Sequence, residues 1–511
     1  MANKLLLSLT LASLLASHTL LAEENMDADL GGFDTETSSS ESFNELDGFG
    51  DEEEVGDDLD GFGDDTSTDK IAVEVQESPS NLSVTGNVAF KTAFGYFNHS
   101  VYADKASPTP SFPQGELLDP VDYQGFNQAQ TSIYLQADYK INSDWKVRVS
   151  GDAFYDAIYD LRDEPYNQDT LDTYKTQLRF DDTYIQGRLT KDIDIKIGRQ
   201  LVVWGKSDSI RITDVINPLD NRLPGMTDIE DLRLATTMAK LDYYVGQWNF
   251  SAMAIVESRI FLEAAPRGEY FPVDNIFPIA PSPFFELVQP NVSWDNMQYA
   301  IAANGVFSGW DLSFYGADVF DSKWHIVPGD TPQNTKRVVG KIQMLGSAVN
   351  IATGSWLLKS EIAFINGVKY NSTDDAKQRL DALIGVDYMG VKDTVLSIEL
   401  ANRHIFDYEV QMGEAVAKPD YIQENEVQTA MRVTRSFEND SINATLLLSM
   451  FGEKWQYGGF FRASVEYDLM DAVVANFGII DYLDTSEPEI RPFTRAIKDN
   501  DKIFADITYS F

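Results

Sequence analysis

The sequence predicts an all-β protein, a transmembrane antiparallel β-barrel of about 18 strands that follows a disordered acidic N-terminal tail. Three observations carry this prediction. From residue 81 onward, apolar and polar residues alternate with a period of two in runs of about ten residues, the length of a tilted transmembrane strand. Short and long connections alternate between these runs. The alternation also continues to the last residue, Phe511, where a soluble domain is usually polar and frayed.

Residues 1–22 have the layout of a secretory signal peptide. Lys4 precedes an apolar run, small residues follow, and cleavage is expected after Ala22. The alternative, an uncleaved membrane anchor, is disfavoured because the run is short and interrupted by Ser and Thr. No later stretch is long and apolar enough for a transmembrane helix, and the chain has no cysteine. We therefore expect the protein in the bacterial cell outer membrane, in contact with its lipid.

Residues 23–80 form the predicted tail, which we expect to lie in the periplasm. Between Glu23 and Asp69 there are 19 acidic residues and no Lys or Arg, a composition that does not fold by itself. A short phrase recurs as LGGFD once and LDGFGD twice. Its apolar residues are candidate docking points for an inner-membrane transporter or periplasmic carrier: Leu30, Phe33, Leu46, Phe49, Leu59 and Phe62. The alternative is that the repeats arose by chance in a low-complexity acidic tail that only keeps the N-terminal region solvated and binds no partner.

Residues 81–511 form the predicted barrel. In the first complete hairpin Ile133 and Leu135 share the apolar face, and Asn142, Ser143 and Asp144 make the turn. Further short turns are expected at Lys191-Asp192, Gly246-Gln247, Ser308-Gly309, Thr353-Gly354, Gly390-Val391, Glu438-Asp440 and Leu469-Asp471. Longer links are expected near 97–127, 158–175, 204–235, 259–294, 321–335, 367–378, 404–424 and 483–500, with one shorter link near 452–456. This layout is typical of an outer-membrane barrel with periplasmic turns and external loops. A soluble β-sandwich, or a barrel of 16 or 20 strands, is the alternative.

The link at 204–235 is dense in charges of both signs and is a candidate pore or constriction loop. With the end of the strand before it, the candidate residues are Arg199, Trp204, Lys206, Asp208, Arg211, Asp214, Asn217, Asp220 and Arg222. Such a loop can fold inward and be fixed by ion pairs. Whether its charges line a pore or only brace the loop is left open by the sequence.

The alternation also predicts which side chains face the barrel lumen. They are Lys146, Arg148, Asp152, Tyr184, Arg188, Lys196, Lys341, Lys359, Glu361 and Arg432. Arg199 is a difficulty, because it shares the parity of Ile195 and Ile197, which would face lipid, where a charge is costly. A bulge at Gly198 would turn Arg199 into the lumen, and a position at the rim is the alternative. We expect the bulge.

The segment GRQLVVWGKSD followed by INPLDNR resembles the proteobacterial outer-membrane family called domain of unknown function 1302. The matching positions are Gly198, Arg199, Gln200, Trp204, Gly205, Asn217, Pro218 and Asp220. The resemblance covers about 25 residues, with the acidic tail outside that core. It implies export of amphiphilic or hydrophobic molecules beside an inner-membrane transporter or a periplasmic carrier. The aromatic C-terminus also resembles outer-membrane proteins as a class, and this implies that Phe511 is a signal for the insertion machinery.

Other function classes find little support in the sequence. The net charge of −41 provides no basic patch for nucleic acid. The histidines beyond the signal peptide, His99, His325 and His404, are far apart and lack a nucleophile motif, so no enzyme is expected. No metal site or cofactor motif is present. The expected function is a conduit that works with a transport partner; the alternatives are a passive diffusion porin constricted by residues 204–235 and an adhesion platform.

Overall fold

The computed structural model describes residues 81–97, 100–101, 121–265, 268–271, 286–330, 334–413, 422–487 and 493–511. All of them belong to one compact unit. The predicted signal peptide, the acidic tail and its six docking residues (Leu30, Phe33, Leu46, Phe49, Leu59 and Phe62) lie outside the described residues.

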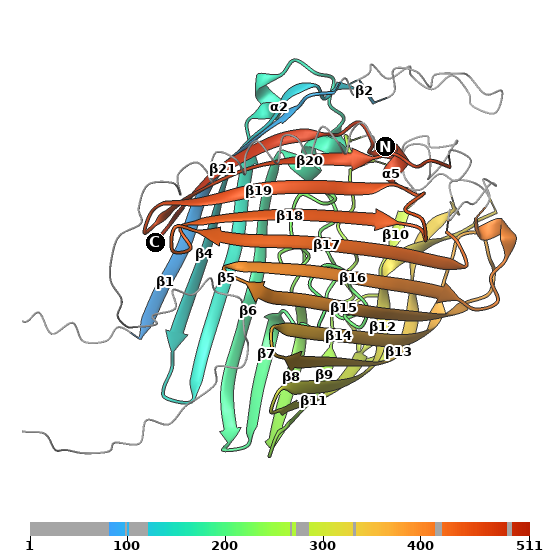
Figure 1. Cartoon of the computed structure of the whole chain (residues 1–511). Coiled ribbons are helices and arrows are strands. Elements are labelled where there is room, and N and C mark those ends of the chain that lie inside the picture. The colour runs from blue at the N-terminus through green and yellow to red at the C-terminus, as the bar shows by residue number, and fades with distance from the viewer. Residues whose placement is uncertain are drawn as a thin grey trace, which may run out of the picture. The chain divides into compact units, whose positions relative to one another are not determined.

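The fold is a closed antiparallel β-barrel of 18 strands within this described part of the chain (Figure 1). Its strands are β1 (Leu82–Gly95), β4 (Gly125–Lys140), β5 (Trp145–Asp156), β6 (Thr176–Thr190), β7 (Ile193–Gln200), β8 (Thr236–Val245), β9 (Trp248–Ile255), β11 (Gln298–Phe307), β12 (Trp310–Val327), β13 (Lys336–Thr353), β14 (Trp356–Val368), β15 (Lys377–Val391), β16 (Thr394–Ile405), β17 (Asn425–Phe437), β18 (Ile442–Phe451), β19 (Gly459–Met470), β20 (Val473–Leu483) and β21 (Lys502–Ser510). The predicted strand count is confirmed.

Short strands and helices lie in the longer links between the barrel strands. β2 (Ser100–Val101) pairs with β3 (Val121–Asp122), and β10 (Glu286–Val288) runs parallel to the start of β13. The helical segments are α2 (Ile158–Leu161), α3 (Gln168–Tyr174), α5 (Phe493–Ala496), η1 (Trp294–Asn296) and η3 (Val410–Met412). None of the helices in the described ranges is long and apolar enough to cross a membrane.

The barrel closes through β1, which pairs with both β21 and β4. The ladder reaches the last residue, because the Phe511 N–H donates to the Gly86 carbonyl at 2.9 Å and the Phe511 carbonyl accepts the Gly86 N–H at the same distance. No edge is left at this seam, which is what a lipid environment requires. Residue 81 and Phe511 both lie at the end of the barrel that carries the short turns.

Eight short turns alternate with nine longer links along the described chain, as expected. The turn between β15 and β16 was misplaced. The sequence favoured Gly390-Val391, but β15 continues through Val391 and the turn is at Lys392-Asp393. Asp393 adopts a left-handed conformation with φ 52°, which aspartate tolerates better than most residues. The glycine therefore lies in the strand rather than in the turn.

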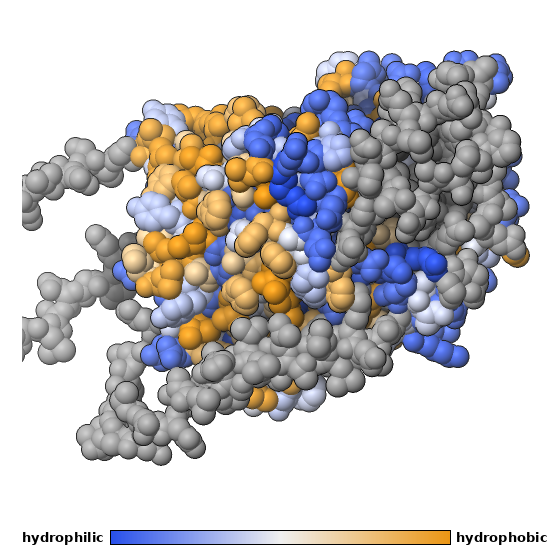
Figure 2. Space-filling view, turned by 90° about the horizontal axis from the view of Figure 1, so that it is seen from above, coloured by the Kyte–Doolittle hydropathy of each residue, from blue (hydrophilic) through white to orange (hydrophobic). Residues whose placement is uncertain are grey.

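The outer face of the barrel is apolar. Exposed leucines, isoleucines and phenylalanines cover its middle, for example Leu135, Ile301, Leu345 and Ile384. In Figure 2 apolar residues gather over one part of the wall, while hydrophilic residues gather toward the opposite end. Exposed aromatic residues lie close to the short turns: Tyr139, Tyr243, Trp310, Trp356, Tyr467, Tyr509 and Phe511. A band of apolar residues with an aromatic girdle is the surface of a transmembrane barrel.

We predict that the Phe511 side chain contributes to membrane assembly beyond its backbone pairing. Phe511→Ala keeps both hydrogen bonds to Gly86 but removes an exposed ring that stacks on Tyr509 at 6.1 Å. The expected result is a severalfold slower appearance of the heat-modifiable folded form in the outer membrane. Phe477→Ala, an exposed aromatic residue in β20, is the control. Equal rates for Phe511→Ala and the unchanged chain would remove the assembly role.

Candidate functional site

Residues 201–235, which connect β7 to β8, enter the barrel and are called the inward loop. Figure 1 shows this green segment running inside the ring of strands. The loop hydrogen-bonds or ion-pairs with side chains of β12, β14, β16, β17, β19 and β20, on the wall opposite the strands that it joins. The inward fold expected from the sequence is what the structure has.

Two buried glutamates of the wall hold the loop backbone. Glu361 of β14 accepts the backbone N–H groups of Lys206 at 2.6 Å, Ser207 at 2.8 Å and Thr213 at 3.2 Å, and the Thr213 hydroxyl at 2.8 Å. Glu399 of β16 accepts three more. The donors to Glu399 are the N–H groups of Asp208 at 2.7 Å, Ser209 at 3.1 Å and Ile210 at 3.1 Å.

Five successive amides, 206–210, therefore point at two carboxylates that are only 2% (Glu361) and 1% (Glu399) exposed. A buried carboxylate is tolerated only where donors surround it, and hydrogen bonds to charged groups contribute about 1.5–3 kcal/mol each. We call Glu361 and Glu399 the glutamate clamp.

The Trp-Gly pair explains how the loop reaches the clamp. Trp204 is buried and stacks on Tyr315 of β12, with ring centroids 4.8 Å apart. Gly205 has φ +98°, and a Cβ there would lie 2.8 Å from a Glu361 oxygen. Only glycine combines that backbone conformation with so close an approach. The tryptophan thus fixes the entry of the loop, and the glycine turns its amides toward the clamp.

The predicted loop charges pair with the wall or with one another. Lys206 reaches Asp311 of β12 at 2.9 Å. Asp208 contacts Lys359, a buried lysine of β14 that also lies 2.7 Å from Asp387 of β15. These pairs join the loop to β12 and β14, and Lys359 links the second pair to β15.

Arg211 and Asp214 form a cluster within the loop. Asp214 pairs with Arg233 at 2.8 Å and lies 3.7 Å from Arg211, whose guanidinium also donates to the Asp214 carbonyl. Burial lowers the pKa of Arg211, while Asp214 acts in the opposite direction. Arg403 of β16 donates to the Arg211 carbonyl at 3.2 Å, which attaches this cluster to the wall.

The Asn-Pro-x-Asp segment ties the two ends of the loop together. Asn217 is fully buried; its side chain accepts the Val202 N–H at 2.8 Å and donates to the Leu234 carbonyl at 2.9 Å. Asp220 pairs with Arg222 at 2.5 Å, and Arg222 donates to the Thr173 carbonyl at 2.9 Å. These residues brace the loop rather than face open solvent.

A second attachment lies further along the loop. Asp228 lies 2.9 Å from Arg432 of β17 and contacts Arg462 of β19. Burial pushes the pKa of Asp228 upward, but the two guanidiniums outweigh it and hold the pKa below its ordinary value. Tyr482 of β20 donates to the Pro224 carbonyl at 2.6 Å.

The barrel interior is more apolar than expected. Trp204, Ile210, Ile212 and Ile216 of the loop are buried in one cluster with wall residues such as Leu383. The sequence predicted a polar, mixed-charge lumen, which holds for the ion pairs but not for this cluster. Since the loop brings its own apolar side chains, it packs as part of the core.

The predicted bulge at Gly198 is not what the structure has. The registers of β7 with β6 and with β8 run through Gly198 without a shift. Arg199 therefore keeps the outward parity of Ile197 and ion-pairs with Glu257 at 2.7 Å, not with the inward loop. The alternative, a position at the rim of the strand, is the observed one.

Lys341 was also placed wrongly in the lumen. It pairs with Asp318 at 3.1 Å on the outer face, while its neighbours Ile342 and Met344 are buried. The other lumen residues predicted from parity lie on the inner side. His325 and His404 lie in different strands, β12 and β16.

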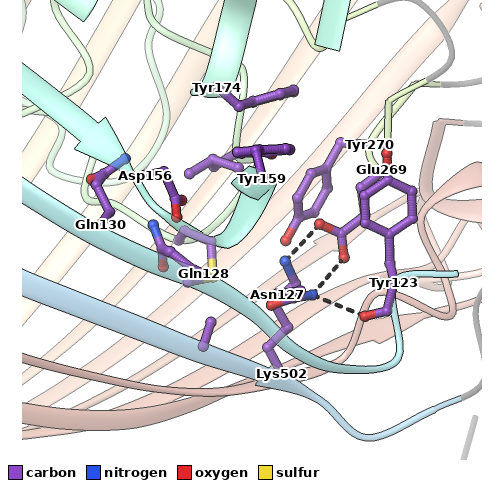
Figure 3. Close-up of a pocket in the computed structure, with 13 residues that line it drawn as sticks. Tyr123, Asn127, Gln128, Gln130, Asp156, Tyr159, Tyr174, Glu269, Tyr270 and Lys502 are labelled. Carbon is purple, nitrogen blue, oxygen red and sulfur yellow. Dashed lines mark hydrogen bonds and ion pairs between the residues drawn. The ribbon is translucent and has the colours of Figure 1, made fainter. Parts of the chain in front are cut away.

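A small cavity lies where the loop meets β4, β21 and the α2–α3 segment (Figure 3). Its volume is about 40 Å³. Glu269 anchors one side, accepting from Asn127 at 3.1 Å and Lys502 at 2.7 Å. Tyr174 donates to the Arg222 carbonyl at 3.1 Å, and burial raises the pKa of Tyr174 well above its usual range. Tyr174 is thereby kept as a hydrogen-bond donor. We interpret the residues around this cavity as supports for the inward loop.

Sequence reasoning missed Glu399, Tyr315 and Arg462. Glu399 alternates with the exposed Ile398 and Leu400, so parity alone could have found it. Its partners lie 189–191 residues away in the chain, and no local pattern identifies them. Across the described ranges, no group of three or more His, Cys, Asp or Glu is placed to hold a metal ion.

Solved structures with a similar arrangement of strands include a porin and other outer membrane proteins. A BenF-like porin from Pseudomonas fluorescens Pf-5 has 11% identity and a TM-score of 0.46 over 84% of this chain and 98% of its own. OpdK from Pseudomonas aeruginosa has 10% identity and a TM-score of 0.44, and the match covers 84% of this chain and 98% of OpdK. OmpT from Vibrio cholerae has 11% identity and a TM-score of 0.38, and the match covers 84% of this chain and 99% of OmpT. These values are too low to transfer an activity. No curated protein matches the chain.

The family described as protein of unknown function (DUF1302) matches residues 4–511. The match is much longer than the 25 residues around Trp204 that suggested it, and it includes the acidic tail, which the sequence analysis had placed outside the family's core. Within the motif, Trp204, Gly205 and Asn217 are residues that shape the inward loop. The chain belongs to the DUF1302 family.

Proposed function

We propose that the protein is a gated outer-membrane channel, a conduit that opens when the inward loop is displaced by a periplasmic or inner-membrane transport partner. The observation that carries this proposal is the glutamate clamp, which holds six loop amides on two wall carboxylates. Because these bonds hold the loop across the lumen, on the wall opposite the strands that it joins, passage of a cargo would require the loop to move.

The energy needed to move the loop supports a partner. Exposing the four buried apolar side chains of the loop (Trp204, Ile210, Ile212 and Ile216) to water costs about 6–12 kcal/mol. Spontaneous displacement of the whole loop would then occur in fewer than about one molecule in 10⁴. A transport partner that binds the displaced state supplies the difference.

The orientation follows from the connections. Short turns face the periplasm in outer-membrane barrels, and long loops face outward. Residue 81 lies at the short-turn end, so the tail at 23–80 would extend into the periplasm. Its Phe repeats are the proposed docking points, and the proposed cargo is amphiphilic or hydrophobic. A passive porin remains the competing function.

We predict that weakening the clamp opens the channel. In Glu361→Gln/Glu399→Gln each carboxylate becomes a neutral amide whose NH₂ group opposes the loop N–H donors, so the loop is held less tightly. Single-channel recordings in planar bilayers should show at least about a tenfold higher open probability, equivalent to roughly 1.4 kcal/mol.

Glu466→Gln is the matched control for the clamp experiment. Glu466 of β19 is a carboxylate whose charged neighbours are Asp468 and Asp506, not the loop. Its substitution should leave the recordings unchanged. A large steady current through the unsubstituted protein would favour the passive porin instead.

We predict that acid weakens the second attachment only at low pH. The pKa of Asp228 is depressed in the folded state, so its contribution is complete above the pKa of an unfolded aspartate, about 3.9, and is lost as the pH falls through the lower folded value. Asp228→Asn should raise the open probability already at pH 7. The difference in open probability between Asp228→Asn and the unchanged chain should be constant from pH 7 to 5 and vanish below about 4, where Asp228 itself becomes protonated. A rise between pH 7 and 5 that Asp228→Asn abolished would contradict this assignment.

We predict that the tail acts through a partner and not on the pore itself. Deleting residues 23–69 should leave single-channel recordings unchanged but reduce capture of periplasmic or inner-membrane proteins by the tail. Substituting Phe33, Phe49 and Phe62 by Ala should reduce capture as strongly as the deletion. Equal capture by the Ala-substituted and unchanged tails would reject these residues as docking points.

A further inference from the structure

The cavity of Figure 3 is lined by a buried carboxylate without a cationic partner. Asp156, the last residue of β5, is 4% exposed and lines the cavity. Its carboxylate accepts two backbone N–H groups, from Ala129 at 2.9 Å and Ile158 at 3.1 Å, and both bonds are made by the same oxygen, Oδ1. Within the described ranges no ion pair is made to Asp156. A buried charge in this state lacks the compensation that it normally has.

An amide oxygen of the cavity also lacks a partner. Asn127 of β4 is 9% exposed, and its Nδ2 donates to the Tyr123 carbonyl at 3.2 Å and to Glu269 at 3.1 Å. Both of these partners accept hydrogen bonds, which fixes the orientation of the amide. Oδ1 is then buried without a hydrogen-bond donor among the described residues. The groups that await a partner in this cavity are therefore acceptors, and the second of them, Asp156, is negatively charged.

The ammonium group of Lys502 shows that this wall attracts cations. Its Nζ lies 2.7 Å from Glu269 and 4.9 Å from the centroid of the Tyr270 ring. The face of an aromatic ring attracts a cation electrostatically. Of the charged side chains that line the cavity, Asp156 and Glu269 carry two negative charges and Lys502 carries one positive charge. One negative charge remains, so one added monovalent cation would balance the cavity.

The size and the apolar side of the cavity indicate which cation fits. The volume of about 40 Å³ is close to the roughly 30 Å³ that a water molecule occupies in the liquid, and a primary ammonium group is of similar size. Ala93 of β1 and the loop residues Leu223 and Met226 give the cavity an apolar side, which suits an alkyl stem. A metal ion is disfavoured, because the described residues place no group of three or more metal-binding side chains together.

The cavity adjoins the water-exposed part of the lumen. Lys91 shares the inner face of β1 with Ala93, lies nearer the short-turn end, and is exposed; it pairs with Asp506 of β21 and Gln130 of β4. Water therefore reaches the inner face of β1 just below the cavity. Throughout the described chain, no hydrogen bond or ion pair joins the inward loop to β1, β4 or β21. The cavity thus lies on the side of the loop that is not bonded to the wall.

We propose that this cavity binds the primary ammonium head of an amphiphilic cargo. The ammonium N–H groups meet the Asp156 carboxylate and the Asn127 amide oxygen, and the alkyl stem lies toward Leu223 and Met226. A quaternary ammonium is rejected, because it has no N–H to donate and its three additional methyl groups exceed the cavity. The site rests on the proposed function where it concerns cargo passage, whereas binding itself requires no open channel.

The first test compares two cations of equal charge on the unchanged chain. n-Propylammonium chloride should raise the temperature at which the heat-modifiable folded form is lost by at least about 2 °C, because a ligand that binds only the folded state stabilises it. The rise should saturate with concentration. Tetramethylammonium chloride at the same ionic strength should give no rise. Equal rises with both salts, or no rise with either, would overturn the ammonium site.

The matched variants locate the effect. Asp156→Asn keeps the size of the side chain but removes its charge, and it should abolish the rise caused by n-propylammonium. Asp506→Asn is the same substitution at a lumen-facing carboxylate of β21 that does not line the cavity, and it should keep the rise. A rise of full size in Asp156→Asn would overturn the site. If Asp156→Asn does not fold, the comparison of the two salts on the unchanged chain still decides.

The second test measures the effect on current and separates the two proposals. In the Glu361→Gln/Glu399→Gln channel, n-propylammonium should reduce the current at a concentration within about threefold of that giving half of the thermal rise, and Asp156→Asn should remove this block. If the clamp variant is folded but carries no current, the channel function fails, and the thermal rise still decides whether the site exists. If current flows and Asp156→Asn leaves the block unchanged, the cargo site is wrong and the channel function stands.

Discussion

The arrangement of the barrel interior depends on the hydrogen bonds between two buried carboxylates and a stretch of loop backbone that pairs with no strand. Glu361 and Glu399 are inaccessible to water and require donors, while the amides of 206–210 have left the sheet and require acceptors. Each supplies the other. The path of the inward loop, the stacking of Trp204 and the glycine at 205 all follow from bringing these groups together.

The loop also changes what kind of barrel this is. A barrel wall normally separates lipid outside from water inside, so its strands alternate apolar and polar residues. Here the loop carries Ile210, Ile212 and Ile216 into the lumen, and wall residues such as Met344 and Leu383 meet them there. The inner face of the wall thus carries apolar side chains beside the charged groups that hold the loop, and loop and wall share one core. Displacing the loop would expose that core, and for this reason the proposed function gives the open state a binding partner.

The sequence determined the fold well because the period of two and the short turns are local signals. Strand count and closure could be predicted from them, and the inward loop could be predicted from its density of charges of both signs. The contacts of the site could not, because Lys206 and Glu361 are 155 residues apart and parity says only that a side chain faces inward, not what it meets. Parity itself failed at Lys341, and the predicted bulge at Gly198 was wrong because the charge of Arg199 is met by Glu257 instead.

The family motif links the inward loop to the strands on either side of it. Gln200 is fully buried, and its side chain donates to the carbonyls of Gly198 and Met238, each at 3.3 Å, where the pairing of β7 with β8 stops. The chain that would have extended β7 upward instead turns into the lumen at Trp204. Residues that fill the lumen are therefore residues missing from the wall. A motif that directs the chain into the lumen as the inward loop therefore also shortens the strand pairing beside it. Any movement of the loop at Val203 would change the filling of the lumen and the wall at the same time.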